Sequence, residues 1–309
     1  MSSTRLTWDS LPPQVTDGVA AILGSPVVSA VSQPSGFSPG QADRVVTADG
    51  TTAFVKSAPE SIGASAGLYR GEAATLALLP PEVGAPALLG VVEEDGWVAL
   101  VTEEVDGKHP AEPPMRAELV AVLDAVAQSP VWPSLDGVAH AEALLGPAFA
   151  VWPRLVHEHR DAVPVWALPL AGRFDEAAAA AASLTAGDRV VHLDLRGDNV
   201  LIDRTGRARL LDWAWGAAGA PWIDALTMLL DARRLGSPDA DALLAEHPAF
   251  DGVAAATIDG ALAGLAGLFL NSSLDPAPPL MPELRPFQAE EAEAAFRWLW
   301  DRTVASPVG

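Results

Sequence analysis

The chain has 309 residues, half of them hydrophobic, so it can form one large domain or two of ordinary size around a substantial core. It contains no cysteine, which excludes disulfides, a thiolate nucleophile and cysteine metal sites. Its formal charge of −21 leaves no basic surplus to neutralise a phosphate backbone, so we expect no nucleic-acid partner.

The sequence gives no clear signal for export or membrane insertion. Residues 1–13 are polar and include a single basic residue, Arg5, so we expect no secretory signal. The longest apolar run near the C-terminus, 260–270, is about half the length that crosses a bilayer. We therefore expect a soluble, cytoplasmic protein with no membrane partner. Its acidity either serves solubility or attracts a cationic small molecule.

The first hundred residues alternate between strand and helix signals. Two pairs, Asp49-Gly50 and Asp95-Gly96, each lie between β-rich runs and predict tight hairpins. The Pro80-Pro81 pair ends a helical pattern. In chain order we expect a helix at 13–23, strands at 27–31, 44–47 and 51–56, a helix at 68–79, and strands at 88–92 and 97–102. These elements predict a small antiparallel sheet.

From about residue 106 helical signals dominate. We expect helices around 119–126, at 176–184 and at 222–235, the last followed by Gly236 as its C-cap. A strand-rich segment, 189–212, interrupts them. The sequence therefore predicts an α+β fold, in which a small antiparallel-sheet domain joins a larger, mainly helical domain near residues 103–108.

The strand-rich segment contains the most informative motif of the chain. His192 and Asp194 follow a β-rich run, Asn199 comes five residues after Asp194, and Asp212 ends the next apolar run. Phosphoryl transfer needs positioned phosphates, metal ions and a carboxylate that orients the acceptor hydroxyl. Asp194 can accept the hydroxyl proton, while Asn199 and Asp212 supply oxygen ligands of the kind that Mg²⁺ prefers. We assign His192 a supporting role.

Each of these loop residues alone would be a turn former or a solvated charge, but the combination rarely arises by chance. The motif resembles the catalytic loop and metal-binding aspartate of the protein-kinase-like superfamily, and most closely the aminoglycoside phosphotransferase family. The resemblance covers nearly the whole chain. It implies a bilobal fold, with a nucleotide-binding N-lobe (1–105) and a helical C-lobe (106–309) that carries the catalytic loop and the acceptor site.

The resemblance also assigns residues that bind the phosphate donor. Lys56 is one of two lysines in the chain and lies at the end of a predicted strand. It is similar to the strand lysine that holds the α- and β-phosphates, and Glu72 in the next helix is similar to its ion-pair partner. The implied donor is ATP, with GTP as the alternative, and the implied metal is Mg²⁺ on Asn199 and Asp212.

Two further segments match the family less closely. Residues 35–40, including Ser38, occupy the place of the nucleotide-covering loop but depart from the protein-kinase glycine pattern. Glu103 and Val105 occupy the place of the hinge, where their backbone groups would bind the adenine edge. An exposed linker explains the same hinge residues equally well.

Other positions depart from the family pattern or extend it. Leu193 stands where the family usually has glycine. Arg196 stands where small-molecule kinases commonly have histidine, and a guanidinium there could stabilise the transferring phosphate as a catalytic group. Asp224 resembles the helical aspartate that hydrogen-bonds the backbone of the catalytic loop, which is a structural role.

We therefore expect an enzyme that moves the γ-phosphate of ATP to a hydroxyl of a small molecule, such as an aminoglycoside or another antibiotic, with a role in antibiotic resistance. Choline, homoserine or a sugar are alternative acceptors. A nucleotide-binding pseudoenzyme is the alternative from another class, but such proteins usually lose the lysine, the base or a metal ligand, and this chain keeps all of them. The acceptor residues and the oligomeric state are left open.

Overall fold

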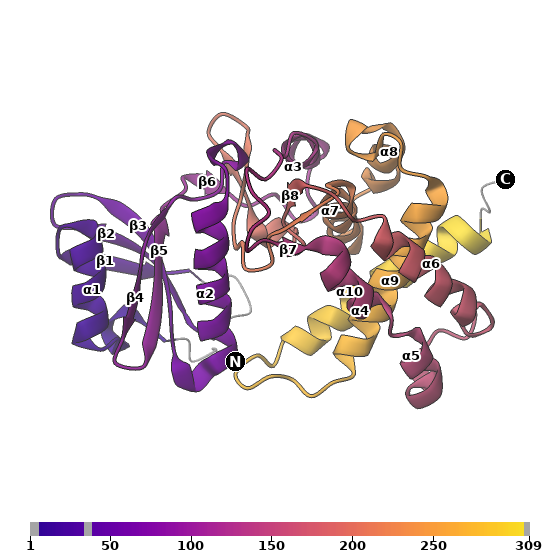
Figure 1. The fold of residues 1–309 in the computed structure, drawn as a ribbon, viewed down its shortest axis with the longest axis horizontal. Helices are drawn as coiled ribbons and strands as arrows, with labels where there is room; N and C mark the ends of the chain where they lie inside the picture. Colours follow the sequence, from indigo (N-terminus) through magenta and orange to yellow (C-terminus); the bar gives the residue numbers. More distant parts are fainter. Residues whose placement is uncertain (1–5, 34–38, 306–309) are drawn as a thin grey trace.

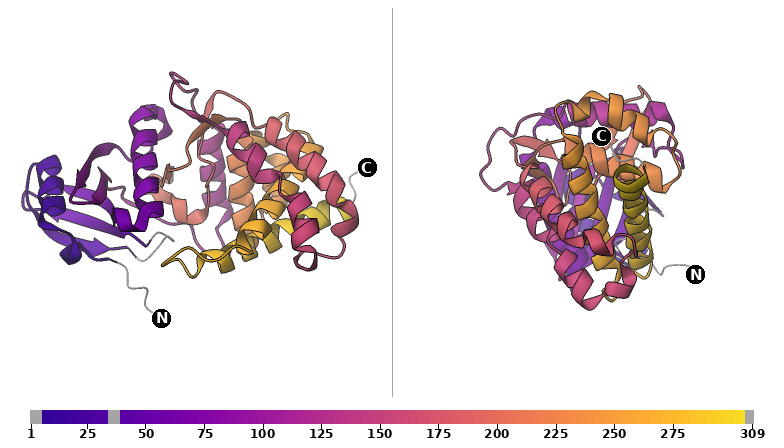
Figure 2. Two further views of the ribbon diagram at one scale, coloured as in Figure 1. Left: turned by 60° about the horizontal axis from the view of Figure 1, so that its bottom comes forward. Right: turned by 90° about the vertical axis from the view of Figure 1, so that its right-hand side faces the viewer.

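The computed structural model describes residues 6–33 and 39–305. They form two parts that lie side by side along the long axis of the molecule, a sheet with two helices and a larger helical part (Figures 1 and 2). This is the predicted α+β arrangement of a small antiparallel sheet and a mainly helical remainder.

The first part is a five-stranded antiparallel sheet with the strand order β1-β2-β3-β5-β4. Its strands are β1 (Val27–Ser32), β2 (Gln41–Thr47), β3 (Thr52–Pro59), β4 (Leu88–Glu94) and β5 (Trp97–Glu103). Helix α1 (Pro13–Leu23) packs on one face and helix α2 (Gly63–Leu78) on the other. The sheet is therefore covered on both sides.

The alternation of side chains along β3 orients Lys56. Ala53 and Val55 are fully buried in the cluster that also contains residues of α1. Because successive side chains of a strand point to opposite faces, Phe54 and Lys56 face the other way, into the cavity between the two parts. The apolar pattern of β3 thus fixes the direction in which Lys56 points.

The second part packs its helices around one large apolar core. Its helices are α3 (Arg116–Ala127), α4 (Ala141–Phe149), α5 (Trp152–Glu158), α6 (Ala171–Ser183), α7 (Trp222–Arg234), α8 (Ala240–Glu246), α9 (Ala255–Ser273) and α10 (Leu284–Trp300). Two three-stranded sheets lie among them, built from β6 (Gly107–Lys108), β9 (Val200–Asp203) and β10 (Ala208–Leu210), and from β7 (Ala139–His140), β8 (Arg189–Val191) and β11 (Ala217–Gly219).

Two predicted helices begin earlier than the sequence indicated. Helix α2 starts at Gly63 instead of 68, and α6 starts at Ala171 instead of 176. In both cases a short 3₁₀ turn leads directly into the helix, and no side chain caps its N-terminus. The usual signal for a helix start is a capping residue, so its absence hid these boundaries.

Helix α9 lies in the core, packed against α6 and α10. Among the helices of the described residues it alone is long and apolar enough to cross a membrane by length and composition, and 56% of its apolar window is buried inside the protein. Three glycines, Gly260, Gly264 and Gly267, each lie against another segment so closely that a Cβ would touch it. The missing side chains let α9 approach its neighbours.

Gly264→Ala is therefore expected to destabilise the fold by about 1–3 kcal/mol, because the added methyl would overlap the ring of the fully buried Phe149. The matched control is Gly67→Ala in α2, where a Cβ meets no atom within 4 Å. That change should stabilise the helix by about 0.5–1 kcal/mol. Chemical denaturation of both variants measures the difference, and equal effects would contradict the tight packing of α9.

Candidate active site

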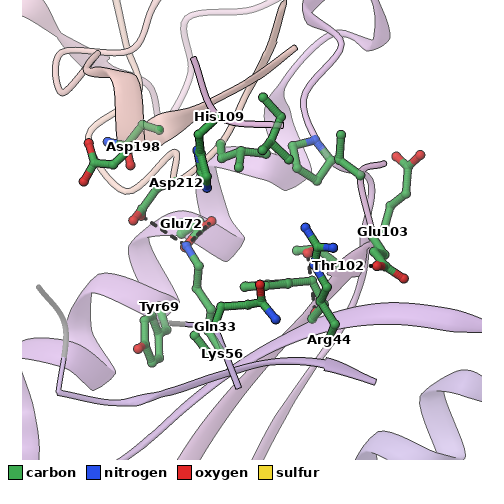
Figure 3. A pocket seen from close by; sticks show the side chains of 18 residues that line it. Gln33, Arg44, Lys56, Tyr69, Glu72, Thr102, Glu103, His109, Asp198 and Asp212 are labelled. Carbon is green, nitrogen blue, oxygen red and sulfur yellow. Dashed lines mark hydrogen bonds and ion pairs between the residues drawn. The ribbon is translucent and has the colours of Figure 1, made fainter. Parts of the chain in front are cut away.

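Lys56 lies between two carboxylates at the junction of the two parts. Its Nζ is 2.7 Å from Oε2 and 3.0 Å from Oε1 of Glu72 in α2, and 3.3 Å from Oδ1 of Asp212. Figure 3 shows the ammonium group between them. The structure thus brings together the strand lysine, its helical partner and the candidate metal ligand, which are far apart in the sequence.

Electrostatics favour the charged form of this lysine. Burial alone would lower the pKa of Lys56, but Asp212 and Glu72 outweigh burial and raise it. Burial raises the pKa of Glu72, with Lys56 opposing it. Burial would also raise the pKa of Asp212, but Lys56 overcomes this and lowers it. Asp212 is therefore ionised beside the lysine, as a cation-binding carboxylate must be.

Asp224 of α7 holds the start of the loop between β8 and β9. This buried carboxylate accepts the backbone N–H groups of His192 at 2.6 Å and Leu193 at 2.8 Å. Leu193 has φ of 61°, a left-handed conformation that is costly for a bulky residue. A glycine would adopt it without that cost. Here the two hydrogen bonds to Asp224 help to maintain it.

His192 connects the two halves of the motif. Its ring is fully buried, which lowers its pKa and favours the neutral form. Its Nε2 lies 2.6 Å from the carbonyl oxygen of Leu211, and its Nδ1 lies 3.3 Å from the backbone N of Asp194. A neutral ring that donates through Nε2 and accepts through Nδ1 satisfies both contacts. The ring therefore connects the loop between β8 and β9 to Leu211, which follows β10 and precedes Asp212.

Asp194 is surrounded by the other polar groups of its loop. Its Oδ1 accepts from Arg196 at 2.8 Å, and the amide Nδ2 of Asn199 lies 2.8 Å from its backbone oxygen and 3.3 Å from Oδ2. Arg196 also forms two hydrogen bonds with Asp198, at 3.1 and 3.2 Å. Burial raises the pKa of Asp194 to about 6, with Arg196 opposing the shift. A carboxylate of this pKa is suited to take up a proton near neutral pH.

Asn199 and Asp212 line the same cavity and fit a hard metal ion. The amide nitrogen of Asn199 is directed to Asp194, which leaves its amide oxygen as the donor for a cation. Magnesium usually binds proteins through one or two such oxygens and takes its remaining ligands from phosphates and water. Within 6–33 and 39–305 no group of three or more His, Asp or Glu side chains gathers around a metal position. A site completed by nucleotide phosphates is the arrangement that suits these residues.

The cavity between the two parts has a volume of about 150 Å³ and continues from Lys56 to the end of β5. Glu103 and Val105 both line it, as the hinge assignment requires of their backbone groups. The carboxylate of Glu103 turns away to accept from Ala87 N at 3.2 Å and from Arg209 at 3.5 Å. Ser38 lies outside the described residues.

Sequence reasoning missed several residues that line this cavity. Arg44 of β2 lies 3.7 Å from Glu104 of the hinge, and His109 contacts the backbone oxygen of Val200 at 2.9 Å. Asp198, the second partner of Arg196, also lines it. The alternation of β2 was a usable signal for Arg44, since it faces the same way as Ala42. Nothing in the sequence pattern pointed to His109 or Asp198.

The kcat/KM for the acceptor is expected to fall about tenfold per pH unit below about pH 6, because Asp194 can accept a proton only when ionised. An ordinary exposed aspartate would place this acidic fall in kcat/KM near pH 4. The raised pKa of Asp194 therefore shifts the loss of activity to higher pH. A kcat/KM profile between roughly pH 5 and 8, with circular dichroism at each pH as the control for folding, measures the effect. Constant kcat/KM across this range would contradict it.

Comparison with known proteins finds one matching family and several solved structures with a similar fold. A family model described as "Phosphotransferase enzyme family" matches residues 34–268. A thermostable mutant of aminoglycoside phosphotransferase APH(4)-Ia, in ternary complex with ADP and hygromycin B, is similar with a TM-score of 0.60 and 14% identity over 96% of this chain and 99% of that chain. No curated protein sequence matches significantly.

Two further solved structures are similar over almost their full length. The GDP and kanamycin complex of APH(2")-IIia has a TM-score of 0.60 and 14% identity, covering 93% of this chain and 97% of that chain. A candidate fructosamine-3-kinase from Thermobifida fusca has a TM-score of 0.55 and 20% identity, covering 92% and 98%. At these identities the likeness establishes a shared protein-kinase-like fold.

Proposed function

The chain belongs to the phosphotransferase enzyme family and is a small-molecule kinase, and we propose that it transfers the γ-phosphate of ATP to a hydroxyl group of an amino sugar such as an aminoglycoside. The observation that carries this proposal is the contact of Lys56 with both Glu72 and Asp212, at 2.7 and 3.3 Å. It connects the groups that phosphoryl transfer needs for the donor.

We assign the donor site as follows. Lys56 binds the α- and β-phosphates, held by Glu72, and the hinge backbone at Glu103 and Val105 binds the base. Asn199 and Asp212 hold Mg²⁺, which neutralises charge on the phosphates when bound. ATP is the proposed donor and GTP the alternative, since similar structures contain ADP in one case and GDP in another.

The acceptor side is assigned to the catalytic loop. Asp194 accepts the proton of the acceptor hydroxyl, and Arg196, 2.8 Å from it, stabilises the transferring phosphate. We place the division between the nucleotide lobe and the acceptor lobe at residues 105 and 106. Consistent with this, β6 at Gly107–Lys108 already pairs with β9 of the helical part.

An amino sugar is the preferred acceptor for two reasons. Two similar structures are complexes with hygromycin B and with kanamycin. The chain also carries a net charge of −21, which attracts cationic molecules over long range. An antibiotic acceptor would give the protein a role in resistance, in the cytoplasm. Choline, homoserine or a sugar are the alternatives, and the name of the Thermobifida protein favours a sugar derivative among them.

Mass spectrometry of an acceptor panel tests the proposal. The purified protein is incubated with ATP or GTP and Mg²⁺ and with amino sugars, simple sugars, choline and homoserine, and products are scanned for the mass of one added phosphoryl group. We expect phosphorylation of at least one amino sugar. Product with choline or homoserine alone would replace the proposed acceptor. No product from any acceptor with either nucleotide would favour the pseudoenzyme.

A further inference from the structure

Helix α7 presents a second buried carboxylate to the catalytic loop besides Asp224. Asp231 lies seven residues later, about two helical turns, and therefore on the same face of the helix. Each of the two side chains belongs to a residue that is 3% exposed. Asp224 accepts N–H groups at the start of the loop, and Asp231 Oδ2 accepts the N–H of Gly197 at 2.8 Å. One rigid helix thus holds the loop at two points.

The two anchor points enclose the reacting part of the loop. Asp194 and Arg196 lie between them, and the N–H of Gly197 belongs to the peptide unit that directly follows Arg196. Fixing that peptide unit limits the backbone rotation that would turn the Arg196 side chain away from Asp194. A Cβ on Gly197 would lie 3.4 Å from Oδ2 of Asp231, which is van der Waals contact. Loop and carboxylate are in close contact.

Asp231 is itself held by a cation. Its Oδ1 accepts from Arg234 at 2.6 and 3.1 Å. Arg234 in turn donates to Glu291 of α10 at 3.0 Å. A buried carboxylate needs such a partner to offset the cost of its desolvation. The ion pair therefore orients the carboxylate of Asp231 towards the loop.

Phe287 of α10 contacts both Arg234 and Arg196. The guanidinium carbons of Arg196 and Arg234 both lie 5.0 Å from the ring centre of Phe287, within the range of a cation–π contact. Asp231 thus restrains the peptide unit that follows Arg196, and Phe287 restrains the Arg196 guanidinium. Arg234 contacts both Asp231 and Phe287.

We propose that Asp231 is a positioning residue for phosphoryl transfer, which acts through the Gly197 amide to hold Arg196 in register with Asp194. This inference rests on the proposed function and deepens the description of the same site. Arg196 and Asp194 act on the transferring phosphate and the acceptor hydroxyl, so a shift of the loop affects the chemical step. Nucleotide binding depends on Lys56 and the hinge, which Asp231 does not contact.

The test compares Asp231→Ala, Asp231→Asn and Asp241→Asn in the full-length protein. Asp241 is the matched control because it pairs with Arg233, the neighbour of Arg234 on α7, and does not contact the catalytic loop. We expect Asp231→Ala to lower kcat by about 10- to 100-fold, the effect of a displaced catalytic group, while KM for ATP stays within about twofold. Asp231→Asn should recover part of kcat, since its amide oxygen can still accept the Gly197 N–H. Asp241→Asn should keep wild-type kcat.

Two results would overturn the inference. Unchanged kcat in Asp231→Ala would show that the contact has no effect on catalysis. A joint loss of kcat, ATP affinity and thermal midpoint, without recovery in Asp231→Asn, would show that Asp231 only braces the fold. If Asp231→Ala does not fold, Asp231→Asn carries the test: a lowered kcat with KM for ATP within about twofold supports the inference, and wild-type kcat overturns it. Wild-type turnover is measured first, so its absence identifies a failure of the proposed function itself.

Discussion

Asp194→Asn is expected to lower kcat roughly 10²- to 10⁴-fold, the usual contribution of a general base. The amide has the same shape as the carboxylate and can still accept from Arg196, so the loop should keep its conformation. It cannot take up the proton of the acceptor hydroxyl. Nucleotide affinity should stay close to wild type, because Lys56 and Asp212 are unchanged. Steady-state kinetics and calorimetric titration with a non-hydrolysable nucleotide measure the two quantities.

Asp203→Asn is the control for this substitution. Asp203 ends β9 close to the catalytic loop in sequence, but its carboxylate accepts from the turn that follows, at Thr205 and Arg207. It should retain wild-type kcat. If Asp194→Asn also retained most of its kcat, another group would have to act as base. The assignment of Asp194 would then fail, although the family membership would stand.

Asp212→Asn is expected to lower turnover about 10²- to 10³-fold, since a metal ion contributes several kcal/mol to transition-state stabilisation. Asp212 has φ of 62°, and asparagine adopts this left-handed conformation more readily than most residues. The substitution therefore removes the charge with little backbone strain. The change should weaken both the proposed binding of Mg²⁺ by Asp212 and its ion pair with Lys56, which is 3.3 Å long. The Mg²⁺ concentration for half-maximal activity should rise together with the loss of kcat.

Asp95→Asn provides a control with the same backbone constraint. Asp95 has φ of 53° in the turn between β4 and β5. Its replacement measures how an Asp-to-Asn change at a left-handed position away from the cavity affects stability and kinetics. We expect wild-type kinetics. An Asp212→Asn enzyme with the Mg²⁺ dependence of the wild type would show that Asp212 is not a metal ligand.

The sequence predicted the fold and the main site residues where the signal was local or distinctive. Hairpins marked by Asp-Gly pairs and the spacing of Asp194 and Asn199 are local patterns. Lys56 was conspicuous because the chain has so few lysines, and its predicted pairing with Glu72 is present in the structure. Its contact with Asp212 was not predicted. The functional roles of these residues are still predictions that the substitutions above will test.

The network around Asp231 could not be predicted from the sequence. It depends on α10 packing against α7, which brings Glu291 and Phe287 to residues more than fifty positions earlier in the chain. No spacing rule connects such distant side chains, and each one alone looks like an ordinary helical residue. Tertiary packing creates the relation, so it appears only when the helices are placed in space.

The contact of Lys56 with Glu72 and Asp212 has a consequence for how the activity is controlled. In many kinases a helix or loop must move before such a lysine meets its partners. Here both ion pairs are formed, at 2.7 Å to Glu72 and 3.3 Å to Asp212, so Lys56 already has the partners that such a movement would bring to it. We therefore expect turnover of the purified protein to begin without a lag and without prior phosphorylation.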